Sequence, residues 1–99
     1  MAKLGFKKGD KKYIDELYSV ILRLDTKSEA ARFFRDLLTE QEILEFARRW
    51  RAAILLDSKA PYMIIEKDTG LSSATIARIS RWLQKGRGGY KLMLNKIRK

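Results

Sequence analysis

The side chains best suited to chemistry in this sequence form one short group of small, hydroxyl-bearing and basic residues. The group comprises Ser72, Ser73, Ala74, Thr75, Ala77, Arg78, Arg81 and Lys85. Serine and threonine hydroxyls can bind base edges or phosphates, alanine and threonine methyls can contact thymine methyls, and arginine can bind guanine or phosphate. The residue types therefore predict a surface that contacts double-stranded DNA.

The sequence contains no cysteine and no histidine. This composition excludes disulfides, thiolate nucleophiles, imidazole bases and nearly all transition-metal sites. The carboxylates lie mainly in the N-terminal half, and residues 86–89 are interpreted as a glycine-rich helix break rather than a phosphate-binding loop. We therefore predict no enzymatic activity, no metal and no cofactor.

The formal net charge of +10 is unevenly distributed along the chain. Residues 13–47 contain eight acidic and four basic residues, whereas residues 71–99 contain eight basic residues and no acidic residue. A solvated surface explains scattered charges well, but it explains a wholly basic third of the chain less well. A polyanion is therefore the predicted partner of residues 71–99.

Two short helices are predicted on either side of a turn at Gly70. Pro61 suits the first turn of one helix, and Ser72 or Ser73 can cap the next. Glycine between them can adopt a positive φ angle. Apolar side chains are expected to fill the space between the two helices: Ile65, Leu71, Ile76 and Ile79. This pattern predicts a helix-turn-helix over about residues 61–85, although a glycine turn before an amphipathic helix also occurs in ordinary helical bundles.

Further helices are predicted where apolar residues recur at helical spacing. One is expected over residues 11–24, and two more begin at the capping-box pairs Thr26 with Glu29 and Thr39 with Glu42. A last helix is expected after residues 86–89.

A basic cluster of Arg48, Arg49 and Arg51 lies on the third of these predicted helices. We interpret it as a solvated flank on which Glu45 can pair with Arg49 one turn later. Arg48 and Arg49 are also candidates for phosphate contacts.

The 99 residues suffice for one domain. We interpret residues 1–10 as a flexible basic arm and residues 11–99 as the helical domain. Because so small a domain buries only part of its surface, pairing with a second copy is expected to stabilise it. The chain lacks both a signal core and an uncharged run of about 20 residues, so we expect a cytoplasmic protein without membrane contact.

The chain resembles the Trp repressor superfamily, and more closely its YerC/YecD branch of small bacterial proteins. The resemblance runs from the first helix through ARFFRDLLTEQEI and KDTGLSSATIARISRWL to the closing GRGGY, with TGLSSATIARI as its most specific stretch. It implies an all-α fold of six helices per subunit, a helix-turn-helix in the fourth and fifth helices, and an intertwined homodimer made by the outer helices.

The resemblance also bears on a tryptophan site. Thr39, Arg49 and Arg78 fall where tryptophan-binding members have a threonine and two arginines, so Thr39 and Arg49 are candidate effector contacts. Ile79 and Trp82, however, replace a glycine and a serine of those members, and their bulk is expected to occupy the ligand's space. We therefore predict that free tryptophan is not a co-repressor. We also predict that the Trp82 side chain takes the place of the ligand as a built-in wedge.

Together these features predict a sequence-specific transcriptional regulator, in the form of a repressor, that places its helix-turn-helix in the major groove of DNA. A symmetric dimer would meet successive major grooves roughly 34 Å apart, so a pseudo-palindromic site is expected. The alternative is a basic helical module that binds RNA or an acidic protein. That alternative requires aromatic residues that stack on bases from an exposed basic face. In the C-terminal tail, Tyr90 is the only good candidate for this role.

Overall fold

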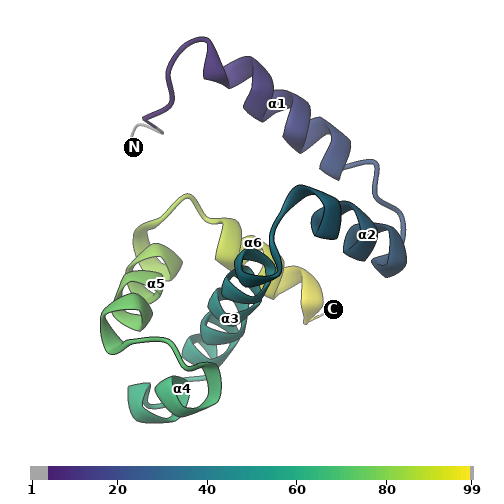
Figure 1. The fold of residues 1–99 in the computed structure, drawn as a ribbon. Helices are drawn as coiled ribbons and strands as arrows, with labels where there is room; N and C mark the ends of the chain where they lie inside the picture. Colours follow the sequence, from purple (N-terminus) through teal and green to yellow (C-terminus); the bar gives the residue numbers. More distant parts are fainter. Residues whose placement is uncertain (1–4, 99) are drawn as a thin grey trace. The chain divides into compact units, whose positions relative to one another are not determined.

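The computed structural model describes residues 5–98, which form six α-helices and no strand (Figure 1). The helices are α1 (Asp10–Ile21), α2 (Lys27–Leu37), α3 (Glu40–Asp57), α4 (Tyr62–Thr69), α5 (Ser73–Lys85) and α6 (Gly89–Ile97). The all-α, six-helix fold expected from the sequence is therefore confirmed. No helix within residues 5–98 is long and apolar enough to cross a membrane.

The helices fall into two compact units, an N-terminal unit of residues 1–38 and a C-terminal unit of residues 39–99. The N-terminal unit contains α1 and α2, and neither helix holds a residue that is buried within the chain. α1 ends at Ile21 rather than at the predicted residue 24, because the N–H groups of Arg23 and Leu24 bond to the carbonyls of Val20 and Ile21 in a tight turn.

The predicted cap at the start of α2 is confirmed. The Thr26 hydroxyl accepts a hydrogen bond from the Glu29 N–H at 3.1 Å. The Glu29 carboxylate in turn accepts from the N–H of Asp25 at 2.9 Å, so the reciprocal bond comes from the residue before the cap. One opening donor of the helix, the Glu29 N–H, and the N–H of the residue before the cap are thereby satisfied locally.

The predicted basic arm lies partly outside the described residues, because residues 1–4 are not among them. Residues 5–9 form no helix, and α1 begins at Asp10. The division of the chain into an arm and a domain stays a prediction.

α3 is the scaffold of the C-terminal unit and packs against α4, α5 and α6. In Figure 1 it runs between α5 and α6, with α4 near its C-terminal end. A complete capping box begins it, as predicted: the Thr39 hydroxyl accepts from the Glu42 N–H at 3.1 Å, and the Glu42 carboxylate accepts from the Thr39 N–H at 2.9 Å.

The core of the C-terminal unit is formed where α3 meets α4 and α5. Its buried side chains are Ala52, Ala53, Ile65, Leu71, Ile76 and Ile79. The two alanines have small side chains, so the branched side chains of α4 and α5 can pack close to the backbone of α3. At the margin of this core the rings of Trp50 and Tyr90 stack at a centroid distance of 6.3 Å and join α3 to α6.

Candidate nucleic-acid interface

The turn between α4 and α5 is held by its own backbone and by one buried hydroxyl. Gly70 ends α4 with φ of 73°, a left-handed conformation that glycine adopts without steric cost, and its N–H bonds to the carbonyl of Glu66 at 2.8 Å. The buried Thr69 hydroxyl donates to the Ile65 carbonyl at 2.7 Å and accepts from the Leu71 N–H at 3.1 Å. The direction in which α5 leaves the turn is therefore set by local bonds.

Ser72 caps α5, which resolves the choice between Ser72 and Ser73. Its hydroxyl accepts from the Thr75 N–H at 3.2 Å and donates to the Thr75 hydroxyl at 3.0 Å. The cap thus engages the proton of Ser72 and leaves that of Thr75 able to donate elsewhere. Ser73 is the first helical residue and is exposed.

The apolar side chains predicted to fill the space between α4 and α5 are buried there. Ile65, Ile76 and Ile79 are fully buried, and Leu71 is nearly so. Their burial fixes the crossing of α4 and α5 and turns the other side of α5 toward solvent.

The exposed side of α5 carries nearly all the predicted DNA-contacting side chains. Exposed residues are Ser72, Ser73, Ala74, Ala77, Arg78, Arg81 and Lys85, whereas Thr75 is half-buried. Small residues occupy the first turns and basic residues the later ones. Neither Arg78 nor Arg81 forms an ion pair within the described part of the chain, so both guanidinium groups are available to an anion.

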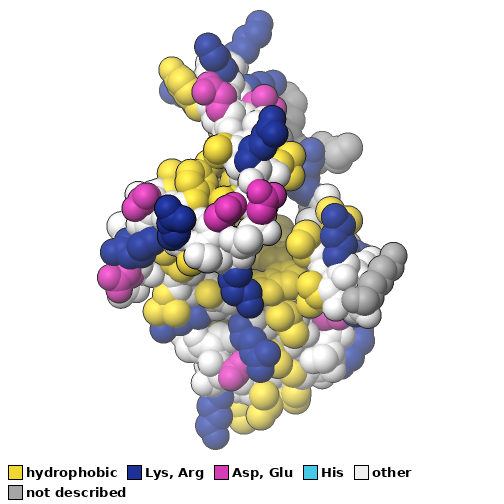
Figure 2. All heavy atoms as spheres, turned by 90° about the vertical axis from the view of Figure 1, so that its right-hand side faces the viewer, with side chains coloured by type: hydrophobic (Ala, Val, Ile, Leu, Met, Phe, Trp, Pro, Cys, Tyr) yellow, Lys and Arg dark blue, Asp and Glu magenta, His cyan; other side chains and the backbone are white. Residues whose placement is uncertain are grey.

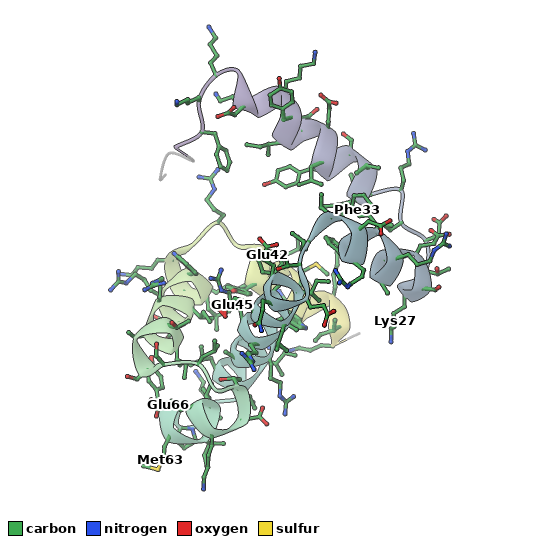
Figure 3. All side chains as sticks on the ribbon, in the orientation of Figure 1. Lys27, Phe33, Glu42, Glu45, Met63 and Glu66 are labelled. Atoms are coloured by element: carbon green, nitrogen blue, oxygen red, sulfur yellow. The ribbon has the colours of Figure 1, made fainter. Side chains whose placement is uncertain are left out.

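The first helix of the pair has a different surface. Lys67 is the basic residue of α4, in its last turn, whereas Met63 is 73% exposed and points away from the unit in Figure 3. Glu66 is half-buried and has no ion-pair partner among residues 5–98. The positive surface of the helix-turn-helix therefore lies on α5.

The basic cluster on α3 does not act as one solvated flank. The Nε of Arg49 pairs with Glu45 at 3.4 Å, as predicted, and the Nε of Arg51 pairs with Asp68 of α4 at 2.8 Å. Arg48 is exposed and faces the turn between α4 and α5, where it lines a pocket together with Arg51. Arg48 and Arg51 thus share one environment beside the turn, whereas Arg49 lies in another.

Of the candidate effector contacts, Thr39 is exposed and uses its hydroxyl in the cap of α3. Arg49 lies near the phenol of Tyr90. Burial raises the pKa of Tyr90 above its ordinary value of 10.0, and the positive charge of Arg49 opposes that rise. Arg49 therefore belongs to a partly buried cluster with Glu45 and Tyr90, apart from the pocket beside Arg48.

The two bulky residues predicted to fill a tryptophan site differ in burial. Ile79 is fully buried in the core of the C-terminal unit. Trp82 is 43% exposed, and it is not among the residues packed against that core. Ile79 is therefore a structural residue, while the role of Trp82 as a wedge stays a prediction.

Sequence reasoning missed the contacts between residues that are distant in the chain. The Arg51–Asp68 pair joins residues 17 positions apart, and the stack of Trp50 on Tyr90 joins α3 to α6. Neither pair follows a helical spacing, so no local signal marks them. Within residues 5–98, no group of three or more histidine, cysteine, aspartate or glutamate side chains is placed to hold a metal ion.

A short helix, a glycine turn and a second helix with a small and basic outer face define a helix-turn-helix protein. Residues 12–98 match the family of Trp repressor proteins, and the chain belongs to that family. The family is one of helix-turn-helix DNA-binding regulators rather than of enzymes.

Three relatives agree with this assignment. The uncharacterized protein YerC of Bacillus subtilis is 39% identical over 87 residues, which cover 88% of this chain and 84% of YerC. The crystal structure of a TrpR-like protein from Eubacterium eligens has a TM-score of 0.84 and 35% identity, over 87% of this chain and 89% of that one. The crystal structure of a candidate Trp repressor from Staphylococcus aureus has a TM-score of 0.84 and 33% identity, over 94% and 96%.

Proposed function

We propose that this protein is a sequence-specific transcriptional regulator, in the form of a repressor, that binds double-stranded DNA as a homodimer in the cytoplasm. In this proposal the exposed side of α5 enters the major groove. Ser73, Ala74 and Thr75 approach the base edges, while Arg78, Arg81 and Lys85 bind guanine or the flanking phosphates.

The observation that carries the proposal is the outer face of α5. Its small first turns leave room for the backbone to approach base edges, and its later turns hold basic side chains without acidic neighbours in residues 71–99. A helix that served only to pack would normally mix acidic residues into its exposed side. Membership of a DNA-binding family supports the same reading.

Unburied apolar side chains support the homodimer. The N-terminal unit exposes Tyr13, Tyr18, Val20, Leu22 and Leu37, and α6 exposes Leu92, Met93 and Ile97. Figure 2 shows hydrophobic side chains over much of the face that it presents. Apolar surface on this scale is rare on a free-standing monomer, and a second copy would bury it. A stable monomer at micromolar concentration in analytical ultracentrifugation would contradict this part.

Independence from tryptophan is a separate part of the proposal. Ile79 fills core space, and Trp82, one turn later in α5, is a large side chain that is 43% exposed. We expect calorimetric titration with free tryptophan to show no binding at micromolar concentration. If Trp82 acts as the wedge, Trp82→Ala is expected to weaken DNA binding, and an unchanged affinity would contradict that role.

Selection from a random duplex pool at about 150 mM salt tests the main proposal, because non-specific phosphate binding is weakened there. The expected result is enrichment of a two-fold symmetric motif, which Arg78→Ala abolishes and which Arg23→Ala, a change at an exposed residue between α1 and α2, preserves. Binding without enrichment would indicate non-specific binding. No binding to any duplex would favour the RNA or acidic-protein module.

A further inference from the structure

A pocket of about 420 Å³ lies between α3 and the turn of the helix-turn-helix, on a different side of α3 from Arg49. Its lining residues are Leu44, Ala47, Arg48, Arg51, Asp68, Thr69 and Gly70. The four residues from α3 follow the spacing of a single helical stripe, and the other three form the facing wall. The pocket thus lies between α3 and the turn that orients α5.

The lining combines apolar and charged residues. Leu44 and Ala47 supply apolar surface, and Gly70 presents no side chain that would fill the space. Two arginines against one aspartate leave the pocket with one net positive charge. An occupant with an apolar part and an anionic part matches this lining.

The two arginines differ in how freely they can bind an anion. Arg48 is exposed and has no ion-pair partner among residues 5–98. Arg51 donates its Nε–H to Asp68 at 2.8 Å, which leaves its terminal N–H groups directed to no described residue. A guanidinium binds phosphate through paired N–H donors, so Arg48 is suited to hold a phosphate and Arg51 to assist it.

We propose that this pocket binds a sugar–phosphate unit, with the phosphate on Arg48 and Arg51 and the sugar over Leu44 and Ala47. The pocket is wide and open to solvent, which suits a nucleotide unit that stays partly exposed better than a fully enclosed small molecule. The unit belongs either to the backbone of bound DNA or to a free nucleotide. The DNA source rests on the proposed function, whereas the free nucleotide does not.

The DNA source is tested by measuring duplex affinity against salt concentration by fluorescence anisotropy. Each phosphate contact contributes about 0.9 to the slope of log affinity on log salt. Arg48→Gln is therefore expected to lower the slope by about one and the affinity by about three- to fivefold, equally for all sequences. Arg23→Gln, at an exposed arginine outside the pocket, is the matched control and is expected to change neither.

Asp68→Asn gives a test of opposite sign. Removing this carboxylate raises the net charge of the pocket from one to two and removes the ion pair that holds Arg51, so duplex affinity is expected to rise by about threefold. A purely structural role of the Arg51–Asp68 pair predicts weaker binding instead. Circular dichroism and thermal unfolding establish that each variant keeps its helices.

The free-nucleotide source is tested with thymidine 5′-monophosphate on the full chain by two-dimensional NMR. Binding in the pocket shifts the Gly70 amide and the Nε–H signals of Arg48 and Arg51, and Arg48→Gln abolishes the shifts. A normal salt slope in Arg48→Gln together with no shift by the nucleotide overturns the proposal. If the wild-type chain binds no duplex, the proposed function fails, and the nucleotide titration alone decides the pocket.

Discussion

The two units of this chain use the same local signals but reach different degrees of burial. α2 and α3 each begin with a threonine that caps the helix through its hydroxyl. The N-terminal unit nevertheless buries no residue of α1 or α2, whereas the C-terminal unit fully buries alanine and isoleucine side chains of α3, α4 and α5. Local signals therefore specify helices, but a core requires a facing surface, which in the proposed homodimer a second copy supplies to the N-terminal unit.

The largest expected difference between the units comes from removing one apolar side chain from each. Ile76→Ala is expected to lower the free energy of unfolding by about 2–5 kcal/mol, because Ile76 is fully buried. Leu22→Ala, at an 83% exposed side chain of the N-terminal unit, is expected to change it by less than about 0.5 kcal/mol in dilute protein.

Urea unfolding followed by tryptophan fluorescence measures this difference, because both tryptophans of the chain, Trp50 and Trp82, lie in the C-terminal unit. Equal losses in the two variants would show that the units unfold as one body. A loss for Leu22→Ala that appears only at high protein concentration would instead locate Leu22 at an interface between copies.

A glycine contact inside the C-terminal unit should have the next largest effect. A Cβ at Gly86 would lie 2.4 Å from the backbone oxygen of Trp82, whereas a Cβ at Gly89 would meet nothing within 4 Å. Gly86→Ala is therefore expected to lower the free energy of unfolding by about 1–3 kcal/mol. Gly89→Ala is the matched control and should leave it unchanged or raise it slightly. The same urea titration measures both variants, and equal midpoints would contradict the prediction.

The two threonine caps test whether identical local bonds count equally in the two units. Thr39→Ala is expected to lower the free energy of unfolding reported by tryptophan fluorescence by about 1 kcal/mol, because the Glu42 N–H loses its partner. Thr26→Ala removes the same bond from α2. In dilute protein it should leave that transition unchanged and reduce only the helix signal in circular dichroism. A shared loss of tryptophan-reported stability would contradict the separation.

The smallest expected effect is a loss of stability at alkaline pH through Tyr90. Burial raises its pKa in the folded chain above 10.0, so the folded state keeps the phenol proton where the unfolded state releases it. The contribution is complete below about pH 10, and it is lost as the pH rises through the folded-state pKa. Tyr90→Phe should flatten the decline of the unfolding free energy above pH 10. An identical decline in both proteins would assign it to other groups.

Much of the helix-turn-helix could be predicted from sequence because its determinants are neighbours in the chain. Gly70 has the positive φ expected of it, Ser72 caps α5, and Ile65 and Ile76 are buried. Each depends on residue type and on spacing of a few positions. The assignment of DNA contacts to the exposed residues of α5 stays a prediction, because contact with a partner is a property of the complex.

The arginines of α3 show where sequence reasoning reached its limit. Their spacing allowed the Glu45–Arg49 pair, one turn apart, to be predicted. It did not indicate that Arg51 reaches Asp68 or that Arg48 lines a pocket with the turn. Successive helix positions point in directions about 100° apart, so adjacent arginines face different neighbours.

The sequence by itself thus determined the six helices, the position of the turn and the concentration of positive charge in residues 71–99. These follow from caps, apolar period and composition, all of which are local or additive properties. Only the tertiary structure decided the partners of the α3 arginines, the stack of Trp50 on Tyr90 and the exposure of Trp82. These depend on which distant segments the core brings together, and the packing of α3 against α4, α5 and α6 sets that arrangement.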